Sequence, residues 1–169
     1  MCPLVGDVRD PVRHADAVSA TSSVQEWRRD GYVVSTDADR LDLDVVHGFL
    51  STSYWASART RDYQRRAIDG SRCFGLYEET TGAQVGFARV VTDGVTFAWI
   101  ADVFVLDEHR GRDLGKFVVG CAVEAHRDVR RLVLGTRDAH GLYAQFGFTP
   151  LTKPERWMER SATTPEGHG

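Results

Sequence analysis

The segment His109–Lys116, HRGRDLGK, places two glycines among cationic side chains directly after a long apolar stretch. Unpaired main-chain N–H groups at such a turn, together with the positive end of a helix dipole, suit a diphosphate. A nucleoside-triphosphate loop of the form GxxxxGK[ST] is excluded, because three residues separate Gly111 from Gly115 and Phe117 follows the lysine. From the turn alone, an ordinary strand-to-helix connection is an equally good interpretation.

Asp102 is the second residue that could do chemistry. It is the one charge inside the apolar stretch FAWIADVFVL, and a lone buried carboxylate is costly. We therefore expect Asp102 to have a partner or to face a cleft.

The elements that must position these residues follow from the hydrophobic periodicity. Alternating strand and helix patterns, with a hairpin signal at TTGA and a late β–α–β unit, predict a mixed α/β (α+β) domain. Strands are expected at 32–36, in CFGLYEE and QVGFARVV, at 96–106 and at 131–136, with one or two closing strands in FTPL and RWMERS. Helices are expected at 42–55, at 60–69, from Asp113 to Ala125 and at 138–146.

Composition narrows the class of protein. The chain has 169 residues and a net charge of −3, which favours one folded domain and argues against a nucleic-acid binder. Three cysteines without CxxC spacing, and no long apolar run, favour a soluble, cytoplasmic protein that does not associate with membranes. We expect a flexible arm at 1–25, the folded domain at 26–161 and a disordered tail at 162–169.

Two separated motifs carry a resemblance to a known family. The order IADVFVLDEHRGRDLGKFVVGCAVEAH, then LVLGTRDAHGLYAQFGF, resembles the GNAT superfamily of acyl-CoA-dependent N-acyltransferases over roughly residues 31–160. Arg110–Gly115 resembles its R/Q-x-x-G-x-G/A signature, and LYAQFGF its second hallmark. SYW, GFARVVTD and TRDAHGLY resemble a bacterial subgroup of mostly unassigned substrate. The resemblance implies a mostly antiparallel sheet of six to seven strands, about four flanking helices and splayed parallel central strands.

The same resemblance implies acetyl-CoA as co-substrate, with no metal, bound between the splayed strands 97–106 and 131–136. Main-chain groups around Val103, Phe104 and Val105 would pair with the pantetheine arm. The diphosphate would be held by the N–H groups of the turn, which consists of Arg110, Gly111, Arg112, Asp113, Leu114, Gly115 and Lys116.

Catalytic and acceptor-binding roles are likewise implied by resemblance. Tyr143 matches the family's general acid, with a core packing role as the alternative. Asp102 matches the second acid of the Glu-Asp pair of polyamine acetyltransferases, whose first position is here Ala101. Asp102 would act as a base through water, bind the ammonium group or have a structural role. Tyr54 and Trp55 fall where the family builds its acceptor wall, although simple packing also explains them.

Asp113 departs from the family pattern, which usually has glycine there. As a helix N-cap it would stabilise the helix by about 0.5–2 kcal/mol, whereas its charge would repel a diphosphate. We expect weakened but retained CoA binding. The predicted function is acetyl transfer to a primary amine of a small molecule or peptide, with homodimers possible. The alternatives are a non-catalytic CoA-binding module and, more remotely, a partner-binding domain.

Overall fold

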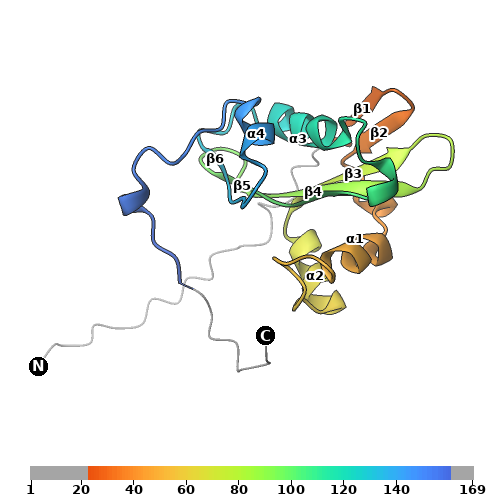
Figure 1. The fold of residues 1–169 in the computed structure, drawn as a ribbon, viewed down its shortest axis with the longest axis horizontal. Helices are drawn as coiled ribbons and strands as arrows, with labels where there is room; N and C mark the ends of the chain where they lie inside the picture. Colours follow the sequence, from red (N-terminus) through yellow and green to blue (C-terminus); the bar gives the residue numbers. More distant parts are fainter. Residues whose placement is uncertain (1–22, 161–169) are drawn as a thin grey trace, which may run out of the picture.

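The computed structural model describes residues 23–160, which form one six-stranded sheet with four α-helices (Figure 1). The strands follow the chain in the order β1-β2-β3-β4-β5-β6, and every neighbouring pair is antiparallel except β5 and β6. This confirms the mixed, mostly antiparallel α/β prediction. The elements are β1 Glu26–Arg29, β2 Tyr32–Ser35, α1 Leu43–Leu50, α2 Arg61–Asp69, β3 Arg72–Glu78, β4 Gln84–Thr92, β5 Ala98–Val105, α3 Leu114–Ala125, β6 Leu132–Leu134 and α4 His140–Ala144.

The first hairpin, β1–β2, is the strand pair that the periodicity did not predict. Asp30 and Gly31 join the two strands, and both have positive φ, 49° and 79°. An Asp-Gly pair in this conformation is the preferred two-residue hairpin turn. The dipeptide was therefore the available sequence signal for β1.

Helices cover both faces of the sheet and create two cores. On one face α3 packs Val118, Cys121 and Ala122 against a cluster that includes Phe74 and Val90. On the other face, which α1 and α2 cover, Val46 and Leu50 pack against strand residues that include Phe87 and Phe104. Phe49 of α1 also stacks on Phe104, with ring centroids 4.1 Å apart. Strand β5 therefore has α1 packed on one face and α3 packed on the other (Figure 1).

Strand β5 separates from β6 after a short shared stretch. The parallel pairing joins Ala98–Ile100 to Leu132–Leu134, and β5 then continues to Val105 with β4 as its sheet partner. The main chain from Ala101 onward therefore has one side without a strand. The splayed pair lies at the end of the described sheet, because no further strand is added to β6.

A β-bulge occurs where the splay begins. Phe87 lies opposite Phe104 and Arg89 opposite Ala101, so Ala88 faces both Asp102 and Val103. Asp102 has a φ of 54°, a left-handed conformation that aspartate tolerates better than most residues. Bulges turn a side chain away from the regular alternation, and here the redirected side chain is a carboxylate.

The predicted closing strands in FTPL and RWMERS are wrong for the described residues. The chain from Phe148 to Arg160 contains no strand, and its one regular turn is the 3-10 helix Pro154–Arg156. Pro150 and Pro154 have no N–H to give to a ladder, which interrupts pairing on both sides of the segment. The segment extends from the end of α4 away from the helices (Figure 1).

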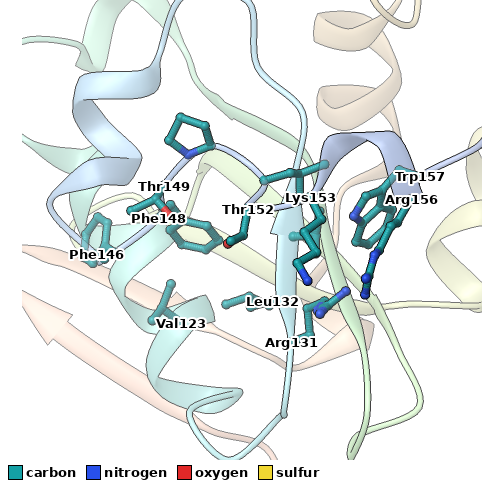
Figure 2. A pocket seen from close by; sticks show the side chains of 14 residues that line it. Val123, Arg131, Leu132, Phe146, Phe148, Thr149, Thr152, Lys153, Arg156 and Trp157 are labelled. Carbon is teal, nitrogen blue, oxygen red and sulfur yellow. The ribbon is translucent and has the colours of Figure 1, made fainter.

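A cavity of about 820 Å³ lies between this segment, β6 and the end of α3. Figure 2 shows Phe146 and Phe148 at one side of it and Arg131, Lys153, Arg156 and Trp157 at the other. The Arg131 guanidinium lies 5.6 Å from the centroid of the Trp157 ring.

The predicted arm at 1–25 and the tail at 162–169 lie almost entirely outside the described residues. Across residues 23–160, the longest helix is α3, of 12 residues, and no helix has the length and apolar character to cross a bilayer.

Candidate active site

The turn before α3 presents a run of main-chain donors. Within residues 23–160, the N–H groups from Gly111 through Lys116 donate no main-chain hydrogen bond, and no side chain caps the helix. The first helical bond is that from the Phe117 N–H to the Asp113 carbonyl, 3.0 Å. Gly111 has a φ of 78° with open space around it, so the chain turns tightly there without a side chain in the way. Such a run of donors at a helix N-terminus is suited to a phosphate group.

Asp113 stands at the N-cap position but does not act as a cap. Its φ of 55° is left-handed, and its carboxylate accepts no bond from the helix N–H groups. The side chain instead pairs with Lys116, 3.2 Å away, in an exposed position. The expected capping contribution is therefore absent. The backbone conformation explains why glycine is the better residue here, because glycine adopts a positive φ without a steric penalty.

Residues from the first hairpin hold the turn in place, a support that sequence reasoning missed. Arg29 donates through Nη2 to the carbonyls of Arg112 and Asp113, at 3.4 and 2.9 Å. Arg112 donates to the Tyr32 hydroxyl at 2.6 Å, and the same hydroxyl lies 3.0 Å from His109 Nδ1. Arg29 and Tyr32 precede the turn by more than 75 residues. No local spacing signals such contacts.

The β5–α3 groove, of about 470 Å³, runs from the free side of β5 to this turn. Every residue predicted to bind the co-substrate lines it except Arg112, which is turned toward Tyr32. Arg110 is also committed in part, because it pairs with Asp107 at 2.9 Å and donates to the Val105 carbonyl at 3.2 Å. The groove is lined by Val103, Phe104, Val105, Arg110, Gly111, Asp113, Leu114, Gly115, Lys116, Ala139, Leu142 and Tyr143.

A second cavity, of about 580 Å³, shares Val103, Ala139 and Tyr143 with the groove, and we call it the arginine cavity. It joins the segment after α1, the first half of β5 and the loop between β6 and α4. Tyr54 and Trp55, the residues expected in the acceptor wall, line this cavity, together with Trp99, Arg59 and Arg137, which sequence reasoning did not single out. The full lining is Tyr54, Trp55, Arg59, Trp99, Ile100, Ala101, Asp102, Val103, Gly135, Thr136, Arg137, Asp138, Ala139 and Tyr143.

Asp102 has the partners that its burial requires. Arg59 Nη1 donates to both carboxylate oxygens at 2.8 Å, and Arg89 Nε donates to Oδ2 at 2.8 Å. The Asp102 side chain is 1% exposed, whereas the Arg59 side chain is 24% exposed toward the cavity. Asp102 therefore has partners and also lines a cavity, so both forms of the expectation hold. The carboxylate supplies a fixed charge that orients Arg59.

Tyr143 lines both the β5–α3 groove and the arginine cavity. It sits on α4, whose start is fixed by the Ala139 N–H donating to the Thr136 hydroxyl at 3.0 Å. Burial, with a smaller contribution from Tyr54, raises the pKa of Tyr143 above the ordinary tyrosine value. The hydroxyl therefore keeps its proton across the neutral range.

The 820 Å³ cavity beside the segment from Phe148 to Arg160 shares no lining residue with the groove or the arginine cavity. Its wall carries no carboxylate, histidine or cysteine. It therefore lacks the imidazole and carboxyl groups that most often serve in acid–base catalysis. Across the described residues, no cluster of three histidine, cysteine, aspartate or glutamate side chains is placed to hold a metal ion.

Comparison with known proteins agrees with this geometry. The Acetyltransferase (GNAT) domain model matches residues 69–150. A Gibberella zeae protein, an acetyltransferase by name, is 32% identical over 142 residues, which cover 72% of this chain and 80% of the relative. A crystal structure of a GNAT protein from Xanthomonas campestris pv. campestris has 47% identity and a TM-score of 0.73, covering 80% of this chain and 96% of that one.

A more distant structure, N-acetylglutamate synthase of Neisseria gonorrhoeae complexed with coenzyme A and N-acetyl-glutamate, shows the shared fold at 15% identity and a TM-score of 0.60. The match covers 76% of this chain and 30% of the synthase chain. By fold and by relatives, the protein is an acetyl-transferring enzyme. The chain belongs to the GNAT family and is an N-acetyltransferase.

Proposed function

We propose that the enzyme transfers the acetyl group of acetyl-CoA directly to a primary amine, with Tyr143 as the proton donor. The observation that carries this proposal is the position of Tyr143, which is shared by the β5–α3 groove and the arginine cavity. The groove fits acetyl-CoA chemically. It combines unpaired N–H groups at Gly111–Lys116 with the strand-free side of β5.

The reaction needs a neutral amine, a carbonyl carbon and a proton for the sulfur. The ammonium form of the acceptor loses its proton to solvent, because Asp102 is enclosed by two arginines and accepts three hydrogen bonds from them. The cationic groups of Arg59 and Arg137 favour the neutral amine. The amine nitrogen then bonds to the thioester carbonyl carbon, the carbon–sulfur bond breaks, and the Tyr143 hydroxyl protonates the departing sulfur. The new amide nitrogen loses a proton to solvent and the Tyr143 oxygen regains one from solvent, so the enzyme returns to its starting state.

The test is the Tyr143→Phe variant, which removes one oxygen and keeps the ring. We expect kcat to fall about 100-fold with little change in acetyl-CoA affinity, since general acid catalysis contributes factors of this order. Initial rates of CoA release and calorimetric titration with acetyl-CoA measure the two quantities.

Tyr63→Phe is the matched control, because Tyr63 is half exposed on α2 and lines neither the groove nor the arginine cavity. Its kcat should equal that of the wild type. A Tyr143→Phe enzyme with wild-type kcat would remove Tyr143 from the mechanism.

A further inference from the structure

The charged groups of the arginine cavity differ in how free they are to bind a ligand. Four charged residues line it, namely Arg59, Arg137, Asp102 and Asp138. The Asp102 carboxylate is enclosed, and Arg59 and Arg89 together bring two positive charges to its single negative one. Asp138 is exposed and lies 3.5 Å from Arg137, so that each offsets the other's charge. The four lining charges cancel, and the cluster carries one net positive charge when Arg89 is included, which pairs with Asp102 but does not line the cavity.

Arg59 retains donors that Asp102 does not use. Its Nη1 makes both bonds to the carboxylate, and within residues 23–160 its Nε and Nη2 have no hydrogen-bond partner and are not among the buried unpaired atoms. This Nε–Nη2 edge is the one that Arg61 uses to hold an Asp44 oxygen, at 3.0 and 2.7 Å. The edge that remains on Arg59 is therefore suited to a carboxylate or phosphate oxygen.

Arg137 stacks on an aromatic ring in addition to its exposed ion pair with Asp138. Its guanidinium lies 3.8 Å from the centroid of the Tyr54 ring, and Tyr54 packs edge-on against Trp55. Stacking occupies one face of the guanidinium plane and leaves its edge to in-plane partners, of which Nη2 has the exposed Asp138 carboxylate at 3.5 Å. Two arginines from distant segments thus face one cavity, the first oriented by a buried carboxylate and the second by a ring.

We infer that the acceptor is an amine that also carries an acidic group, a carboxylate or a phosphate, which Arg59 and Arg137 bind. The inference rests on the proposed function and adds the substrate class. A polyamine is the disfavoured acceptor, because the one buried carboxylate that could bind its second ammonium group is already paired with Arg59 and Arg89.

The experiment compares each acidic amine with a counterpart that lacks the acidic group or its charge. The panel contains the proteinogenic amino acids and their α-amides, O-phosphoethanolamine with ethanolamine, and putrescine, each with saturating acetyl-CoA. We expect the best acidic amine to exceed its neutral counterpart by about tenfold or more in kcat/KM, as charge-assisted binding implies. The amino acid and phosphoethanolamine arms tell a carboxylate from a phosphate.

Arg137→Gln is the decisive variant, because Arg137 is exposed and its loss leaves no buried charge unpaired. It should raise KM for the acidic amine about tenfold, leave the neutral amine nearly unchanged and so remove the preference. Arg59→Lys keeps a cation for Asp102 but lacks the planar fork, and it should weaken the acidic amine similarly. Arg65→Gln, an exposed arginine of α2 outside the cavity, should change neither acceptor.

The outcomes separate the two proposals. If acetyl-CoA gives no thermal stabilisation, the proposed function fails, and the inference fails with it. If acetyl-CoA binds but neutral amines or putrescine react as well as acidic ones, or no amine of the panel reacts, the inference alone is overturned. An acidic preference that persists in both arginine variants would remove Arg59 and Arg137 from acceptor recognition.

Discussion

The β5–α3 groove and the arginine cavity meet at Tyr143, yet the chain builds them in opposite ways. Most of the groove comes from one continuous stretch, the end of β5 and the turn into α3, and it offers mainly main-chain groups. The cavity takes residues from three separate segments, and its character comes from side chains such as Arg59, Trp99 and Arg137. A main-chain site depends on backbone conformation, whereas a side-chain site depends on long-range pairing. The two should respond differently to substitution.

Removal of the Asp102 charge should give the largest effect. Asp102→Asn keeps a side chain that tolerates the positive φ but leaves Arg59 and Arg89 without their shared anion. We expect the free energy of unfolding to fall by about 3 kcal/mol, since breaking a buried ion pair from one side is costly. Acetyl transfer should fall as well, while the affinity for acetyl-CoA stays nearly constant. Urea unfolding and titration with acetyl-CoA measure the two.

Asp44→Asn provides the control, because Asp44 also pairs with an arginine, Arg61, but is 80% exposed. Its loss should cost less than about 1 kcal/mol, as exposed ion pairs do. Equal destabilisation by the two variants would contradict the structural role of Asp102. A large loss of acetyl-CoA affinity in Asp102→Asn would show that co-substrate binding in the groove depends on the cavity.

An intermediate effect is expected when the support of the turn is removed. Arg29→Ala deletes the donor to the Arg112 and Asp113 carbonyls and the cation over the Phe117 ring. We expect the Kd for acetyl-CoA to rise about tenfold, equivalent to one charge-assisted hydrogen bond. The neighbouring Arg28→Ala, whose partners are Glu26 and Glu79, should leave that Kd unchanged. If Arg29→Ala also leaves it unchanged, the groove does not depend on the hairpin.

The smallest effect concerns Asp113, where charge and backbone act together. Asp113→Gly removes the positive-φ strain and the exposed carboxylate beside Lys116, so acetyl-CoA should bind about threefold to tenfold more tightly. Asp113→Asn removes the charge alone, because asparagine also tolerates this conformation. Equal gains in the two variants would assign the effect to charge. Weaker binding in Asp113→Gly would mean that the acid helps to shape the turn.

Sequence periodicity was sufficient for most of the fold. The strands and helices from Tyr32 to Ala144 lie where the pattern predicts them, except that the helix expected over 42–55 ends at Leu50. Each element buries an apolar face that repeats with a period of two or of about three and a half residues. The exceptions are short. Strand β1 is indicated by an Asp-Gly turn and not by periodicity. The expected closing strands are interrupted by Pro150 and Pro154.

By itself, the sequence determined the local half of the site. The turn follows from contiguous residues, whereas the free stretch of β5 and the place of Tyr143 followed from the family resemblance that two motifs carry. The sequence also required a partner for Asp102, because a lone carboxylate in an apolar strand is costly. Only the tertiary structure decided that the partners are Arg59 and Arg89 and that Arg112 faces Tyr32. Ion pairs and cation–ring contacts join residues that are adjacent in space but distant along the chain, and local periodicity carries no record of them.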